Sequence, residues 1–161
     1  MRVPNGGPGA EPDGRLDAWL VTDERAELIA AIRRRARALG PEPRVVEFAA
    51  HGLRVEPRPV VHTSHPSFGY LIQAASRTIV WAPEFWSFPV WATGADLMFA
   101  DAAGWSSLIR FAGGVGGHAA VVDVAEEARR LRVKRLVLAH LGRPTLRALD
   151  TGERQRSGKS A

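Results

Sequence analysis

The stretch His118–His140, HAAVVDVAEEARRLRVKRLVLAH, decides how the rest of the sequence is interpreted. Its first part has apolar residues at helical spacing, which predicts a helix over 119–132. The run 135–139, RLVLA, has the length and composition of a buried strand. A histidine therefore stands on each side of a helix–strand unit. The apolar stripe of the helix consists of Val121, Val124, Ala125, Ala128 and Leu131.

Two further histidines lie upstream, also at the end of an expected strand. Residues 53–61 predict a strand, and the sequence VVHTSHPSFGY places His62 at its end and His65 in the following turn. A histidine at a strand end can project into a cleft at the sheet edge, where a rigid scaffold can present it to a metal. The same pair is compatible with a structural or surface role, because no spacing here is diagnostic of a metal. For His118, the following helix N-terminus would favour the neutral imidazole.

The remaining pattern predicts one α/β domain over residues 15–150. Successive strands without intervening helices pair antiparallel, so we expect a sandwich layer of mixed, mostly antiparallel strands rather than a doubly wound sheet. Thr22 is expected to cap a helix that ends at Gly40. Residues 1–14 and 151–161 are polar or rich in Gly and Pro, which predicts a disordered start and a flexible tail. The other expected strands cover 16–21, 44–48, 68–73, 78–81 and 95–100.

Composition excludes several classes of function. The chain has no cysteine, which removes disulfides, thiolate metal sites and cysteine nucleophiles. No apolar run reaches the roughly 20 residues of a membrane span, and residues 1–14 lack the apolar region of a secretory signal, so a cytoplasmic protein without membrane contact is the expectation. The formal net charge is +5, and only two of the 22 basic residues are lysine. This arginine excess fits either a codon-composition bias or a surface that contacts nucleic acid.

From about Leu53 to Gly142 the chain resembles the C-terminal half of the metallo-β-lactamase superfamily, in its ribonuclease Z and cyclic-phosphodiesterase branch. The block from His118 to His140 is the most specific part of this resemblance, followed by His62 with the FGY strand after it. The segments IVWAPEF at 79–85 and DLMFADA at 96–102 resemble the two strands that follow in the family. The resemblance implies an incomplete αββα sandwich.

The resemblance also implies a metal centre with two zinc ions. The metal ligands would be His62 and His140, with Glu84 in the bridging position that the family usually fills with aspartate. His118 resembles the histidine that protonates the leaving group in phosphodiester cleavage. Asp101 would orient a metal-bound histidine or lie on the surface.

Other residues near the expected cleft have two interpretations. The aromatic residues after Glu84, Trp86 among them, would either wall a substrate cleft, with His65 beside it, or fill the core beneath a loop. The glycines at 113–117 would either cradle a phosphate or serve the backbone alone.

One departure from the family pattern limits the expected activity. No His-x-His-x-Asp-His motif occurs in the sequence, so each zinc ion would keep only two of its ligands. The chain would then be a truncated hydrolase that is inactive alone, one that a complementing chain or homo-oligomer completes, or a non-catalytic remnant. The substrate would be a small-molecule or nucleic-acid phosphodiester or related ester, and a remnant would bind nucleic acid through its arginines.

Overall fold

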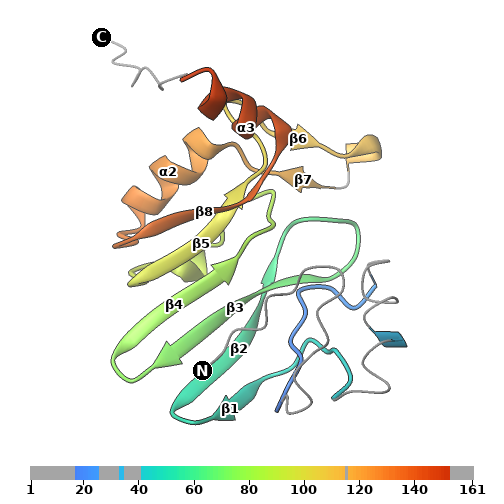
Figure 1. The fold of residues 1–161 in the computed structure, drawn as a ribbon, viewed down its shortest axis with the longest axis vertical. Coiled ribbons are helices and arrows are strands. Elements are labelled where there is room, and N and C mark those ends of the chain that lie inside the picture. Colours follow the sequence, from blue (N-terminus) through green and yellow to red (C-terminus); the bar gives the residue numbers. More distant parts are fainter. Residues whose placement is uncertain (1–16, 26–32, 35–40, 115, 153–161) are drawn as a thin grey trace.

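A computed structural model of the chain describes residues 17–25, 33–34, 41–114 and 116–152. Its main element is a six-stranded mixed sheet (Figure 1). The strands, in their order across the sheet, are β1 (Phe48–Ala50), β2 (Leu53–Val60), β3 (Ser67–Ala74), β4 (Arg77–Ala82), β5 (Leu97–Ala102) and β8 (Leu136–Leu141).

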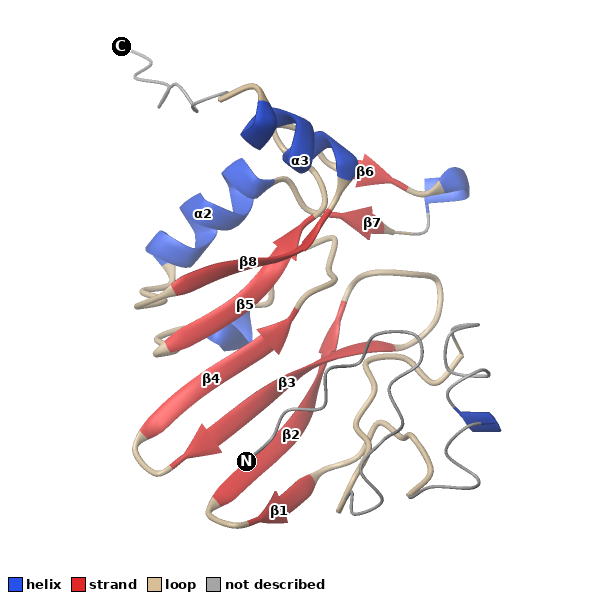
Figure 2. Cartoon of the chain, in the orientation of Figure 1, coloured by secondary structure: helices blue, strands red, loops and turns tan. Residues whose placement is uncertain are grey.

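The direction of the strands changes halfway across the sheet. β1 to β4 form an antiparallel meander, whereas β5 pairs with β4, and β8 with β5, in parallel (Figure 2). Parallel neighbours need a crossover, and the segment between β5 and β8 contains one. That segment holds the two-stranded sheet of β6 (Ile109–Arg110) and β7 (Gly117–His118), the 3-10 turn η2 (Ala112–Gly114) and helix α2 (Val121–Arg130). The α/β class with a mixed sheet is therefore confirmed.

Strand β2 tolerates two prolines because half of it has a partner on one side only. Pro57 and Pro59 pair with β3, but β1 pairs with β2 only over Leu53–Val55. The stretch with the prolines is therefore a sheet edge, where a residue without a backbone N–H does not cost the sheet a hydrogen bond.

The core lies between the sheet and α2. The helix buries Val121, Val124 and Ala128 against β5 and β8, three of the five residues of the expected stripe. Ala125 is exposed, and Leu131 lies just beyond the end of the helix. The facing strand residues Val80 and Met98 are completely buried. Other members of the core are Ala82, Phe85, Ala92, Ala95, Ala100 and Ala119. Phe85 thus fills the core beneath a loop, one of the two roles considered for the aromatic cluster; the 3-10 turn η1 (Val90–Ala92) closes that loop.

The predicted strands from residue 53 onward are confirmed within a few residues, but two earlier ones are wrong. Of residues 17–21, only Leu20 forms a β contact, an isolated parallel bridge with Arg44. The expected strand over 44–48 likewise reduces to this bridge, and β1 begins only at Phe48. Pro41 and Pro43 stand directly before the bridge and have no backbone N–H, so a ladder cannot extend in that direction.

The helix expected after Thr22 falls mostly on residues outside the described ranges. Within them, Thr22 lies in a bend, and the side chain of Asp23, not that of Thr22, accepts a hydrogen bond from the backbone N–H of Arg25 at 2.6 Å. Helix α3 (Arg143–Asp150) follows β8 directly and is not among the predicted elements. No helix in the described part of the chain is long and apolar enough to span a bilayer.

A cluster of charged side chains just before β5 makes the stability of the fold depend on pH in the acid range. The hydrogen bond from Lys134, the backbone N–H of Thr78 and the charge of Arg77 lower the pKa of Asp96 from 3.8 to about 2. A carboxyl whose pKa is lower in the folded state stabilises the fold above its unfolded pKa, and the contribution is lost as the pH falls through the folded pKa. We therefore expect Asp96→Asn to destabilise the chain near neutral pH.

The difference in unfolding free energy between wild type and Asp96→Asn should shrink as the pH falls from about 4 to about 2. Urea unfolding at a series of pH values measures it. A difference that stays constant over that window would show that the hydrogen-bond geometry, and not the charge of Asp96, carries the effect.

Candidate metal centre

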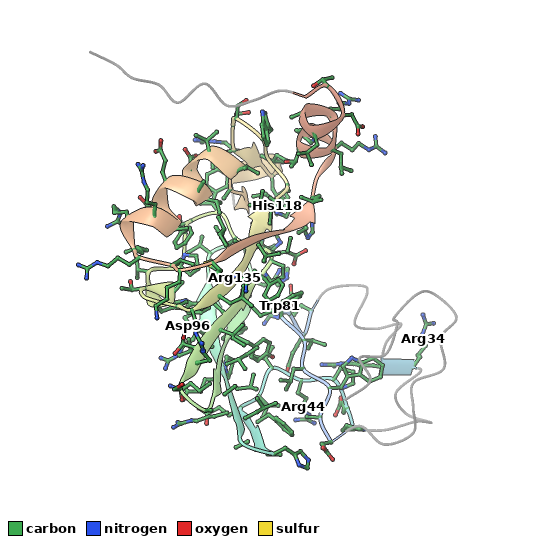
Figure 3. The ribbon with its side chains drawn as sticks, turned by 60° about the vertical axis from the view of Figure 1, so that its left-hand side comes forward. Arg34, Arg44, Trp81, Asp96, His118 and Arg135 are labelled. Carbon is green, nitrogen blue, oxygen red and sulfur yellow. The ribbon has the colours of Figure 1, made fainter. Side chains whose placement is uncertain are left out.

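The predicted site residues come from separate elements and meet at one end of the sheet. His62 follows β2, Glu84 follows β4, and Asp101 lies near the end of β5. His118 ends β7, and His140 lies near the end of β8. Figure 3 shows His118 at this end of the sheet, below α3. The strand ends therefore bring together residues up to 78 positions apart in sequence, from His62 to His140.

The imidazole rings form a row with His118 in the middle. The ring centre of His118 lies 4.8 Å from that of His62 and 4.9 Å from that of His140. Phe111 packs its ring edge-to-face against two of them, 5.4 Å from His62 and 5.3 Å from His118. This aromatic contact fixes two rings of the row from one side.

Glu84 lies between the two outer histidines. One carboxylate oxygen, Oε1, is 2.9 Å from Nδ1 of His140, and the other, Oε2, is 3.8 Å from Nε2 of His62. Each oxygen thus faces one histidine. His140 and Glu84 are about one-third exposed, whereas His62 is buried, so the site opens to solvent at the His140 end.

Two glycines allow the chain to approach His62 closely. Nδ1 of His62 donates a hydrogen bond to the carbonyl oxygen of Gly117 at 2.9 Å, which leaves Nε2 facing Glu84. The backbone N–H of Gly117 in turn donates to the carbonyl oxygen of His62. A Cβ at Gly116 would lie 2.0 Å from that same carbonyl oxygen. These glycines therefore serve backbone packing, and the amide of Gly117 is not free for a phosphate.

A break in strand pairing turns His140 toward the site. The register between β5 and β8 shifts after Asp101, which pairs with Ala139, while Ala102 pairs with Leu141. His140 is the extra residue of this bulge and has a positive φ of 48°. A bulge of this kind re-aims a side chain, and a non-glycine residue holds such a conformation only where its surroundings require it.

Asp101 and His118 form a buried hydrogen-bonded pair. Nδ1 of His118 donates to Oδ2 of Asp101 at 2.7 Å, and Asp101 is completely buried. Burial lowers the pKa of His118, but the bond to Asp101 and the charges of Asp101 and Glu84 outweigh it and raise the pKa above its ordinary value. The two carboxylates therefore oppose the bias toward the neutral imidazole that was expected from a helix N-terminus, and α2 begins only at Val121.

Two other predicted residues lie apart from the row. The carboxylate of Asp23 is the partner of His65, and this contact ties the segment of residues 17–25 to the turn after β2. Trp86 lies against Gly117, and the guanidinium of Arg110 stacks over its ring at 5.1 Å. No side-chain hydrogen bond, ion pair or ring contact joins His65 or Trp86 to the described residues His62, His118 and His140. The sequence gives no signal for Phe111, which does contact the row.

The donor set fits zinc in kind but not in number. Imidazole nitrogens and carboxylate oxygens are zinc ligands, and the bond from His62 to a backbone carbonyl is typical of a metal-bound histidine. Yet among the described residues no group of three or more His, Cys, Asp or Glu side chains is arranged to hold a metal ion. Each ion would receive one imidazole and one oxygen of Glu84, whereas zinc needs three or four ligands.

The chain has no spare histidine to complete the set. All five histidines are described, and His51 pairs with Asp17 at 3.3 Å, before the start of β2. His62 follows the end of that eight-residue strand, so roughly 25 Å separates the two. The described residues therefore bring three histidines and one glutamate together without forming a complete metal site.

Comparison with known proteins identifies the family and the fold of the chain. The domain family described as "Beta-lactamase superfamily domain" matches residues 12–141. No curated protein matches the sequence. Among solved structures, the metallo-beta-lactamase fold protein YhfI from Bacillus subtilis is similar with a TM-score of 0.59 and 14% identity, over 84% of this chain and 71% of that one.

Two further solved structures share the fold at low identity. A diphosphatase from the PhnP family has a TM-score of 0.56 and 17% identity, over 86% of this chain. An isothiocyanate hydrolase from Delia radicum gut bacteria has a TM-score of 0.50 and 15% identity, over 85% of this chain. The chain spans only 52% of the former and 63% of the latter. By its family match and its fold, the chain belongs to the beta-lactamase superfamily of metallo-β-lactamase-fold proteins.

Proposed function

We propose that this chain carries the proton-donating part and half of the metal ligands of a hydrolase that cleaves phosphodiester or related ester bonds, in the manner of the ribonuclease Z and cyclic-phosphodiesterase branch. The single observation that carries the proposal is the His118–Asp101 pair, with the ring of His118 between those of His62 and His140. A general acid must lie within hydrogen-bond reach of the leaving oxygen, and the row marks where an ester would lie.

The pair is suited to protonating a leaving group. Asp101 accepts the hydrogen bond from Nδ1 of His118, which fixes the ring and leaves Nε2 to face the site. The raised pKa of His118 increases the fraction that carries a proton at Nε2. That proton can pass to the oxygen of the departing alcohol, and Asp101 stabilises the ring before the transfer. Activation of the attacking water is not assigned to any of these residues.

The ion toward which His62, Glu84 and His140 point is proposed to be zinc, and the compartment to be the cytoplasm. Imidazole and carboxylate donors suit zinc. Because two donors per ion are too few for tight binding, we expect only weak zinc binding by the chain alone, and His140→Ala should weaken it further. Calorimetric titration with zinc measures this independently of turnover.

The principal test of the proposal is His118→Ala. With zinc supplied, hydrolysis of a phosphodiester that has a poor, alkyl-type leaving group should fall by about 10²–10⁴-fold, because the departing oxygen then needs a proton. An aryl ester with an acidic leaving group should lose far less. The difference between the two substrates is the signature of a lost general acid.

His51→Ala is the matched control for this experiment. His51 is an exposed histidine before the start of β2, at the opposite end of this strand from His62, so its removal should leave both rates unchanged. Equal losses on both substrates in His118→Ala would contradict the role as proton donor.

The incomplete ligand set supports one alternative, a non-catalytic remnant that contacts nucleic acid through arginine side chains. No zinc binding and no turnover in the wild type would favour it. RNA binding by such a remnant should then weaken steeply with added salt, since its contacts would be to phosphates.

A further inference from the structure

The ring of Trp86 fills a gap in the surface of the β6–β7 hairpin. This hairpin projects beyond the ends of β5 and β8 (Figure 2), and its register places Arg110 opposite Gly117. A Cβ at Gly117 would lie 2.5 Å from Cε3 and 2.6 Å from Cζ3 of Trp86. The six-membered part of the indole therefore lies where any other residue at position 117 would place its side chain. A glycine at this position lets the ring lie directly against the backbone.

Arg110 contacts the same indole from the opposing strand. Directly opposed residues of an antiparallel pair have their side chains on one face, so Arg110 lies on the face where Gly117 has none. Its guanidinium carbon lies over the ring of Trp86, 5.1 Å from the ring centre. No carboxylate of the described residues forms an ion pair with this guanidinium, and the ring face, which attracts cations, is its partner. We call Arg110, Trp86 and Gly117 the indole cluster.

Gly117 connects the indole cluster to His62. Its N–H donates to the carbonyl oxygen of His62, and its own carbonyl oxygen accepts from Nδ1 of the same residue, each at 2.9 Å. A carbonyl oxygen can only accept, so the second bond requires a proton on Nδ1 and leaves Nε2 facing Glu84. The backbone N–H of Trp86 also donates to the carbonyl oxygen of Val61 at 2.5 Å. The cluster therefore holds both His62 and the residue before it.

We propose that Trp86 and Arg110 are positioning residues that set the tautomer and direction of the His62 ring through Gly117. Arg110 keeps the indole against Gly117, and the indole keeps the Gly117 carbonyl within reach of Nδ1 of His62. The ring then presents Nε2 to the site. This inference rests on the proposed function only for the use that it gives to His62. The ring of His118 is oriented by a different, buried carboxylate and serves as a reference in the same molecule.

The tautomer of His62 in the full chain tests the proposal. Nuclear magnetic resonance reads it from the ring nitrogen signals in mildly alkaline solution, where imidazoles are neutral. The wild type should show the Nδ1–H form alone. Trp86→Leu should show both tautomers, whereas Trp86→Phe, which keeps a flat ring against Gly117, should retain the wild-type form. His118 should keep its single tautomer in both variants, because its partner is unchanged.

Amide hydrogen exchange measures how firmly the indole cluster holds Gly117. Its N–H should exchange at least about tenfold faster in Trp86→Leu than in the wild type. In Arg110→Gln the rate should rise about two- to fivefold, the size expected for one exposed cation–ring contact. Trp81→Leu, which also removes an indole, and Arg129→Gln, which also removes an exposed cation, are the matched controls. Neither control should change the exchange rate or the histidine tautomers.

Three results would overturn the proposal. The first is a Trp86→Leu chain that keeps the Nδ1–H form of His62 alone, and the second is an equal tautomer change in Trp81→Leu, which would indicate a general loss of packing. The third is an unchanged exchange rate in Arg110→Gln, and this variant carries the test if Trp86→Leu does not fold. None of these measurements depends on turnover, so they are independent of the rates in His118→Ala that test the proposed function.

Discussion

Asp101→Ala is expected to lower the free energy of unfolding by about 3–5 kcal/mol. The buried carboxylate accepts three hydrogen bonds: from Nδ1 of His118 at 2.7 Å, and from the backbone N–H groups of Phe85 and Ala103 at 2.9 Å each. Alanine would leave all three donors buried without an acceptor, and each such loss is costly. Because a domain is stable by only about 5–15 kcal/mol, this change removes a large share.

Urea denaturation measures this loss, and Asp123→Ala is the matched control. Asp123 is an exposed acid in the first turn of α2, so its removal should cost less than about 1 kcal/mol. The ring signals of His118 should also change in Asp101→Ala, because the ring loses its orienting bond. A cost similar to that of Asp123→Ala would contradict the structural role given to the Asp101 carboxylate.

Local sequence patterns are sufficient to predict the helix and strands of the part of the fold that packs on α2. The stripe of Val121, Val124 and Ala128 and the apolar strand after it have clear periods, and tertiary packing agrees with them. The two strands predicted before residue 48 are wrong for a physical reason. Its apolar run includes Leu20, but a strand exists only with a ladder partner, and the prolines before Arg44 leave a single bridge.

The sequence indicates which residues gather at the candidate site, but it does not indicate which side chains contact one another there. Strand-end histidines are visible in the sequence, and the structure brings His62, His118 and His140 into one row. The bulge that turns His140 depends on a register shift between β5 and β8, which no local pattern encodes. His65 lies only three residues after His62, yet it pairs with Asp23, a carboxylate 42 positions earlier in the sequence. Long-range partners decide these roles.

Gly116→Ala is expected to cost at least about 3 kcal/mol and to displace His62. Gly116 has a φ of +144°, which L-residues rarely adopt, and its Cβ would lie 2.0 Å from the carbonyl oxygen of His62. A backbone atom cannot yield as a flexible side chain can, so one of the two segments must shift. The shift would break the hydrogen bond from Nδ1 of His62 to Gly117, which holds the ring toward Glu84.

Gly94→Ala separates conformational strain from the steric clash. Gly94 also has a positive φ, +73°, but nothing lies within 4 Å of the added Cβ, so only strain of about 1–2 kcal/mol is expected. Urea unfolding gives both costs, and the excess for Gly116→Ala measures the contact with His62. Contacts between the rings of His62 and Phe111, seen by nuclear magnetic resonance, should persist in Gly94→Ala and weaken in Gly116→Ala. Equal costs for the two variants would show that the loop moves freely, and the position of His62 would then have to come from Phe111 and the turn after β2.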